Sequence, residues 1–220
     1  MPIDNIDRPI EKDPEDLIKI LGERGTMLLL EIMRDAYFDL LKDNEKYEEM
    51  DEDQITENWF VRISQRWRQS SSIPFSIIPI HQKPDKSKAK RRGKSPVIDF
   101  CFRGDWDKRV YFGTECKLVE ADNKTLCNKY VNNGLMRYFD GKYNPICQEA
   151  AMVGYIRKTS FQNVAIEINA RLRSKDSSWS LNKKEALMPF EGYYISTHTR
   201  TDKPSFLIHH LFLTFTKIEP

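Results

Sequence analysis

Two apolar segments separated by a short polar loop constrain the fold of this chain more than any other feature. Val97–Arg103 and Arg109–Glu120 are rich in β-branched and aromatic residues, which is typical of strands. Gly104–Lys108 between them combines glycine with polar residues, as turns do. We therefore predict that the two segments form a β-hairpin.

Apart from their end residues, these apolar segments contain three charged residues: Asp99 in the first, and Glu115 and Lys117 in the second. A charge in an apolar environment costs free energy unless it is paired or bound to a metal. Residues two apart on a strand share a face, so Glu115 and Lys117 point the same way while Cys116 points into packing. A turn near the middle of the loop places Asp99 opposite residue 113 or 115 on that face. We expect two carboxylates and a lysine to meet there.

The pattern of an acidic residue two positions before a lysine occurs three times, at residues 115–117, 122–124 and 140–142. Only the first lies within an apolar strand. Two carboxylates suit Mg²⁺, which takes a few acidic ligands together with water and phosphate oxygens. The lysine can position or deprotonate an attacking water and balance charge in the transition state. The competing interpretation is a cross-strand salt bridge between Lys117 and either acid.

Further elements follow from periodicity and capping signals. A first helix begins after the cap Asp13 and carries an apolar face to Leu41. We predict further helices over residues 55–67, 123–139, 145–156 and 161–173, and further strands over residues 75–80, 192–199 and 205–217. The fold class is thus α/β or α+β, a mixed central sheet flanked by helices. We divide the chain into an acidic N-terminal helical region, residues 1–54, and one domain, residues 55–220.

Charge is unevenly distributed along the chain, although the net charge is only +2. Residues 1–58 hold 18 acidic and 7 basic side chains, and the remainder holds 15 and 28. The acidic end suggests a docking face for a protein partner, and the basic body suggests contact with phosphate. Loop 83–94 is the clearest phosphate-binding candidate, although a solvated loop has the same composition. Its candidate contacts are Lys88, Lys90, Arg91, Arg92 and Lys94.

Composition excludes several other classes of protein. With 40% hydrophobic residues the chain can fill a core, and no apolar run approaches the length of a membrane span. The four cysteines show no CxxC spacing, so we predict neither a zinc site nor a disulfide framework. We expect a cytoplasmic protein without a membrane association.

The charged positions carry a resemblance to a known superfamily. Ile98-Asp99 followed sixteen residues later by Glu115-Cys116-Lys117 resembles the active-site signature of the PD-(D/E)XK, restriction-endonuclease-like nucleases. The segments 130–143, 150–155, 194–200 and 209–213 resemble later helices and strands of members tied to bacterial defence against phage. The resemblance spans roughly residues 55–216. One departure is that Pro96, rather than the residue directly before Asp99, is the nearest proline.

The resemblance implies a restriction-endonuclease-like core and Mg²⁺-dependent hydrolysis of phosphodiester bonds, with Mn²⁺ as an alternative ion. Asp99, Glu115 and the backbone carbonyl of Cys116 would then bind the metal. Such enzymes often add an acid from the helix before the core, for which Glu57 is the best match, although an acid in a first turn also complements the helix dipole. Further expected contacts with nucleic acid are Arg137, Lys142 and His198.

Two functions from different classes remain open at this point. The first is a nuclease of defence or restriction that cleaves DNA, with RNA as the alternative substrate, and a partner such as an ATPase subunit would dock on its acidic region. The second is a catalytically silent binding or assembly subunit with a nuclease-like fold, since fold alone does not grant activity. A homo-oligomer is compatible with either.

Overall fold

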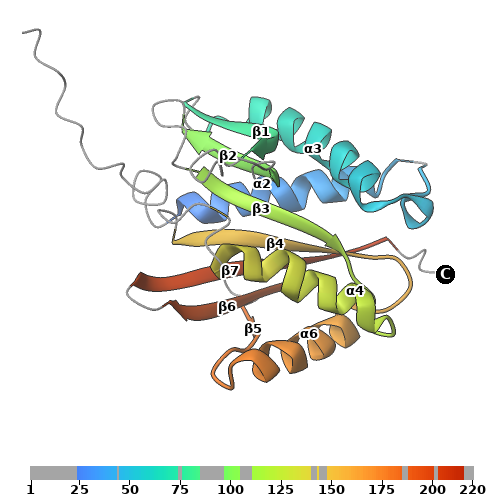
Figure 1. The fold of residues 1–220 in the computed structure, drawn as a ribbon. Helices are drawn as coiled ribbons and strands as arrows, with labels where there is room; N and C mark the ends of the chain where they lie inside the picture. The colour runs from blue at the N-terminus through green and yellow to red at the C-terminus, as the bar shows by residue number, and fades with distance from the viewer. Residues whose placement is uncertain are drawn as a thin grey trace, which may run out of the picture.

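A seven-stranded mixed sheet forms the centre of the molecule, in the order β1-β2-β3-β4-β7-β6-β5 (Figure 1). The structure is a computed structural model that describes residues 24–43, 45–73, 76–84, 97–104, 111–139, 143, 148–184, 188–200 and 203–215. The strands are β1 (Ile77–Pro84), β2 (Val97–Gly104), β3 (Tyr111–Leu118), β4 (Glu149–Ile156), β5 (Asn182–Lys183), β6 (Tyr193–Arg200) and β7 (Lys203–Thr214). β4 runs parallel to both β3 and β7, and the other neighbours are antiparallel.

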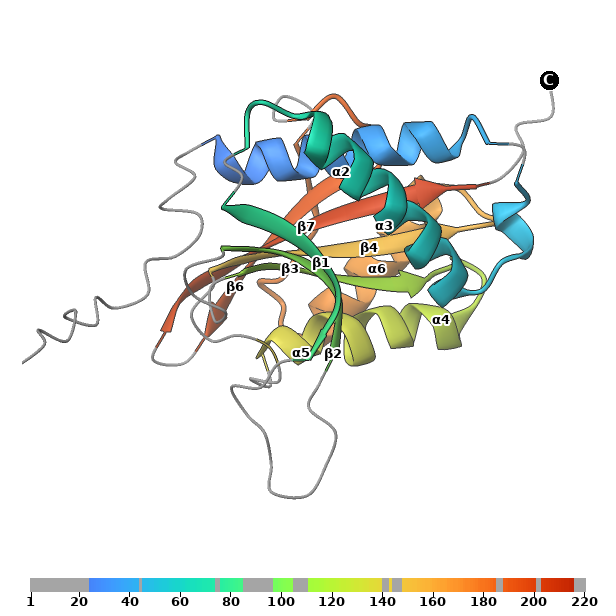
Figure 2. The same ribbon diagram turned by 90° about the horizontal axis from the view of Figure 1, so that it is seen from above.

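Helices cover both faces of this sheet (Figures 1 and 2). α2 (Gly25–Leu40) and α3 (Glu52–Gln69) contribute to the hydrophobic cluster on one face, and a short 3-10 turn, η1 (Tyr47–Glu49), joins them. The opposite face carries α6 (Phe161–Lys175) and a helical run made of α4 (Lys124–Asn128), the π-helical segment η3 (Lys129–Leu135) and α5 (Met136–Phe139). The fold is therefore a mixed α+β sheet flanked by helices, as predicted.

Residues on the two sides of residue 54 share one core. Leu29 and Met33 of α2 belong to the same buried cluster as Phe100 and Tyr155 of the sheet. The indole of Trp59 on α3 donates a hydrogen bond to the backbone oxygen of Met33 at 3.0 Å. α2, which lies in the predicted N-terminal region, therefore buries its apolar face on the sheet and packs into the same core.

One predicted helix is a strand. The sequence pattern predicts a helix over residues 145–156, but residues 149–156 form β4, at the centre of the sheet. Seven of its eight residues are buried, because β4 lies between two parallel neighbours and is covered by helices on both faces. Such a strand lacks the alternation of polar and apolar residues that identifies a half-buried strand, so periodicity alone does not distinguish it from a helix.

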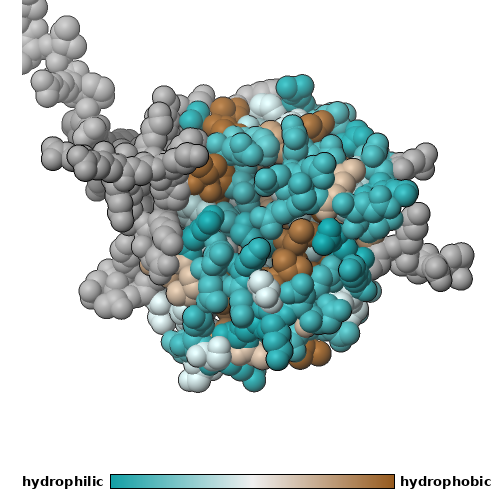
Figure 3. Space-filling model, turned by 45° about the vertical axis from the view of Figure 1, so that its right-hand side comes forward, coloured by the Kyte–Doolittle hydropathy of each residue, from teal (hydrophilic) through white to brown (hydrophobic). Residues whose placement is uncertain are grey.

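The surface shown in Figure 3 is largely hydrophilic, with hydrophobic residues in small separate patches. Among the described residues we find no helix whose length and apolarity would suffice to cross a membrane.

We predict that Tyr37→Phe lowers the free energy of unfolding by about 1–3 kcal/mol, because it leaves two backbone groups of β7 without a partner. The Tyr37 hydroxyl donates to the carbonyl of Thr214 at 2.6 Å and accepts from its N–H at 3.1 Å. Urea denaturation measures the change. Tyr47→Phe is the control, because the Tyr47 hydroxyl bonds to the nearby Asp43 rather than to the sheet. A biphasic transition in the wild type would contradict the shared core.

Candidate active site

The pairing of β2 with β3 brings the predicted acids together. Phe100 lies opposite Thr114 in the antiparallel ladder, so Asp99 and Glu115 occupy the next pair of positions. A side-chain oxygen of Asp99 accepts a hydrogen bond from the backbone N–H of Cys116 at 2.6 Å. The Cys116 side chain is buried in the cluster beneath α2 and α3, which confirms that it points away from the acids.

Lys117 lies at the centre of an acidic cluster. Its ammonium nitrogen is 3.0 Å from Glu115 Oε1, 3.8 Å from Asp99 Oδ2 and 2.8 Å from Glu52 Oε1. It also donates a hydrogen bond to the backbone carbonyl of Cys116. The three residues singled out in the sequence therefore meet on one face, and Glu52 joins them.

The helical acid that reaches this cluster is Glu52 rather than Glu57. Glu52 is the first residue of α3, and its second carboxylate oxygen accepts the backbone N–H of Leu118 at 2.9 Å. Glu57 is exposed, since five residues turn an α-helix by about 140° away from Glu52. The expectation for Glu57 is corrected accordingly. Asp51 caps α3 in a capping box with Gln54, a signal that could have located the helix start and its first acid.

The helical run on the other face approaches the cluster closely. A Cβ added at Gly134 of η3 would lie 2.6 Å from Met152 Cε and 3.5 Å from Lys117 Cγ, so the helix packs closely against β3 and β4, and a larger residue would require the end of the Met152 side chain to shift. Arg137 of α5 then reaches the Glu115 carboxylate, with Nη1 2.8 Å from Oε1. Arg137 thus contacts an acid of the candidate site.

Burial and mutual repulsion dominate the electrostatics of the cluster. Burial, followed by the negative charge of Glu115, raises the pKa of Asp99 to about 7. Burial alone would lower the pKa of Lys117, but the charges of Glu115, Asp99 and Glu52 outweigh it and raise the pKa. The lysine is therefore a cation at neutral pH, suited to hold an anionic group or a water rather than to accept a proton.

The donor set fits a hard divalent cation. Carboxylate oxygens and the Cys116 carbonyl are the ligand types that Mg²⁺ and Mn²⁺ prefer, and Mg²⁺ takes only one or two carboxylates beside water and phosphate oxygens. In the described part of the chain no group of three or more His, Cys, Asp or Glu side chains is arranged to hold a metal ion as it stands. Here the Lys117 ammonium lies among the acids. Burial and then the neighbouring charge of Glu115 raise the pKa of Asp99, and a bound cation would offset that negative charge.

His198 does not lie on a surface that nucleic acid can reach, which corrects its expected role. Its side chain is buried on β6, its Nε2 lies 2.6 Å from the hydroxyl of Ser196, and its ring packs against Phe139 and Trp179. Burial lowers the pKa of His198 to about 4, so the ring is neutral at pH 7. His198 is part of the core.

Other predicted contacts with nucleic acid fall into two groups. Arg137 lies at the acidic cluster, with about a third of its side chain exposed. Lys142 and the loop cations lie outside the described residues; the latter are Lys88, Lys90, Arg91, Arg92 and Lys94.

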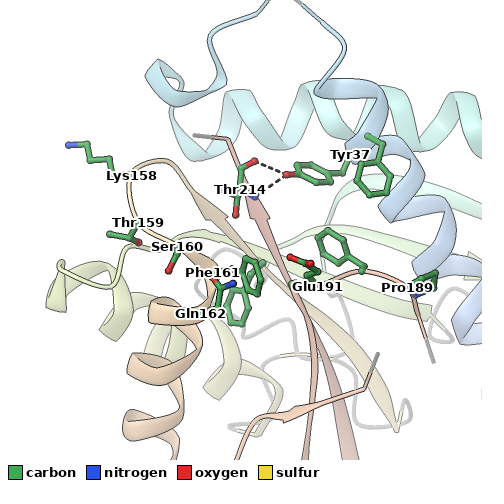
Figure 4. Close-up of a pocket in the computed structure, with 13 residues that line it drawn as sticks. Tyr37, Lys158, Thr159, Ser160, Phe161, Gln162, Pro189, Glu191 and Thr214 are labelled. Carbon is green, nitrogen blue, oxygen red and sulfur yellow. Dashed lines mark hydrogen bonds between the residues drawn. The ribbon is translucent and has the colours of Figure 1, made fainter. Parts of the chain in front are cut away.

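A separate apolar pocket of about 670 Å³ lies between α2, the start of α6 and residues 189–192 (Figure 4). Aromatic rings dominate its wall, among them Tyr37 and Phe190, and Lys158 and Glu191 are its charged residues. None of the clustered acids lines it. The pocket and the acidic cluster are therefore distinct places on the molecule.

No protein-family model matches this chain, and searches of curated proteins and of solved structures found no match either.

We predict that stability falls as the pH decreases from about 6.5 to about 4, partly because of His198. In this window the unfolded chain takes up a proton at this histidine while the folded chain, whose pKa is about 4, does not. His198→Phe should remove this contribution, which amounts to about 3 kcal/mol at most. Urea denaturation of both proteins at pH 7.5, 5 and 4 measures the difference. Parallel pH profiles would contradict the assignment.

Proposed function

We propose that this protein is a metal-dependent phosphodiesterase that hydrolyses DNA at the cluster of Asp99, Glu115, Lys117 and Glu52. The observation that carries the proposal is the meeting of three carboxylates and one lysine where the first turn of α3 reaches β2 and β3. Burying such a cluster costs free energy, and perturbed titratable groups gather at functional sites.

Each residue has a role that its environment supports. Asp99 and Glu52 are the accessible acids, with 26% and 31% of their side chains exposed, whereas Glu115 is fully buried. Asp99, Glu115 and the Cys116 carbonyl would hold Mg²⁺ or Mn²⁺, which supplies a Lewis acid for the phosphate oxygens. Lys117, held as a cation by its acidic neighbours, orients the attacking water and stabilises negative charge on the phosphorus-bound oxygens.

The reaction adds water across a phosphorus–oxygen bond. The water oxygen bonds to phosphorus and gives up one proton, the bond to the leaving alkoxide breaks, and that alkoxide takes up one proton, so that protons balance overall. The restriction-endonuclease-like resemblance of residues 98–117 supports the same chemistry. It also suggests a bacterial defence or restriction effector, with the acidic N-terminal region as a docking face for a partner such as an ATPase subunit.

A second candidate is a binding or assembly subunit without activity. The ion pairs of Lys117 favour this candidate, because its ammonium already serves as a cationic partner for Asp99, Glu115 and Glu52 within the fold. Such a network could serve stability alone. The two candidates differ in whether removing charge abolishes a measurable reaction.

We predict that Glu52→Gln lowers Mg²⁺-dependent cleavage of plasmid DNA by at least about tenfold, and that Asp99→Asn and Lys117→Met lower it by at least about 100-fold. Rates of nicking with and without EDTA measure the effect. Glu57→Gln is the matched control, since it removes an exposed acid of the same helix. Unchanged cleavage in Lys117→Met would remove the assignment, and wild-type protein inactive with Mg²⁺, Mn²⁺ and its genomic neighbours would favour the subunit.

We predict a second effect from loop 83–94. Replacing Lys88, Lys90, Arg91 and Arg92 by glutamine should weaken DNA binding and reduce the slope of log affinity against log salt by about 0.9 for each phosphate that is no longer neutralised. Fluorescence anisotropy with a labelled duplex at roughly 50–200 mM salt measures both quantities. An unchanged slope would show that these four cations do not bind the DNA backbone.

A further inference from the structure

Glu115 differs from the other acids of the cluster in being completely buried. A buried carboxylate needs hydrogen-bond donors at both oxygens, because neither can be solvated by water. Lys117 and Arg137 both approach Oε1, at 3.0 and 2.8 Å. The hydroxyl of Tyr143 donates to Oε2 at 2.6 Å. Two of these three donors come from outside the sheet.

The Tyr143 hydroxyl joins three separate parts of the fold. It receives a hydrogen bond from Arg137 Nη1 at 2.8 Å, and it lies 3.0 Å from the carbonyl of Val97 at the start of β2. A hydroxyl carries one proton, so it donates to a single acceptor at a time, and the shorter bond to the charged Glu115 oxygen is the stronger one.

The ring of Tyr143 is held as firmly as its hydroxyl. Only 1% of the residue is exposed, and its ring packs edge-on against that of Tyr138 with centroids 5.2 Å apart. The Arg137 guanidinium lies 5.9 Å from the centre of the Tyr143 ring. The two donors therefore support each other, and together they fix the direction in which the Glu115 carboxylate points.

We propose that Arg137 and Tyr143 are positioning residues that hold Glu115 in the orientation required to bind a divalent cation. This inference rests on the proposed metal-dependent function. Arg137 and Tyr143 contact the carboxylate, and this role is separate from the contact with nucleic acid expected for Arg137. Partners that orient a metal-binding carboxylate typically change metal affinity by roughly 10–100-fold when they are removed.

Tyr143→Phe tests the proposal, because it keeps the buried ring and removes only the hydroxyl. We expect the dissociation constant for Mn²⁺ to rise by about tenfold, measured by titration calorimetry without DNA. Tyr138→Phe is the matched control. Tyr138 lies on the helical run that carries Arg137, and its hydroxyl donates to the backbone carbonyl of Ala151 at 3.1 Å. The control should lower the melting temperature without changing Mn²⁺ affinity.

Two further variants keep the test decisive. Arg137→Gln alters a partly exposed side chain, so it should fold even where Tyr143→Phe does not, and it should also weaken Mn²⁺ binding. In a Glu115→Gln background, Tyr143→Phe should produce no additional loss of Mn²⁺ affinity, because its effect acts through Glu115.

The outcomes separate this inference from the proposed function. Mn²⁺ binding at wild-type affinity in both Tyr143→Phe and Arg137→Gln would overturn the positioning role and leave the metal-dependent function intact. A wild-type protein that binds no Mn²⁺ and cleaves no DNA would instead overturn the proposed function, and this inference with it.

Discussion

The ammonium of Lys117 is the charge around which the candidate site is organised. It stands in an apolar strand, where an isolated cation would be expensive to bury, and three acids from three elements offset that cost. Burial raises the pKa of Asp99, and the negative charge of Glu115 raises it further, so a bound cation would offset charge within the cluster. These ion pairs connect the first turn of α3 to the paired strands β2 and β3.

The surrounding fold supplies rigidity on both faces of this pair. On one side α3 is attached to β3 through the Glu52 carboxylate, which holds both Lys117 and the Leu118 backbone. On the other side Gly134 allows the helical run to rest on β4 and on the stem of Lys117. A site assembled from sequence positions so far apart exists only in the folded chain, so any ion bound there stabilises the fold by mass action.

Sequence reasoning can locate Asp99, Glu115 and Lys117 because strand alternation and hairpin register are local properties. It places the helical acid at Glu57, since apolar periodicity in α3 begins near Ile55, whereas the capping box sets the helix start at Glu52. Strand β4 escapes such reasoning because a strand buried on both faces shows no alternation. The bond between Tyr143 and Glu115 joins residues far apart in the chain, and no local pattern in the sequence encodes it.

The π-helical segment η3 changes the direction in which the side chains of the helical run point around its axis. An α-helix advances about 100° per residue, and a π-helix is wound more loosely, so the segment shifts every later side chain around the helix axis. The angular position of Arg137 relative to Glu115 is thus set within η3, before the chain reaches α5. Deletion of one residue from η3 would rotate the guanidinium off the carboxylate while leaving every residue of the acidic cluster in the sequence.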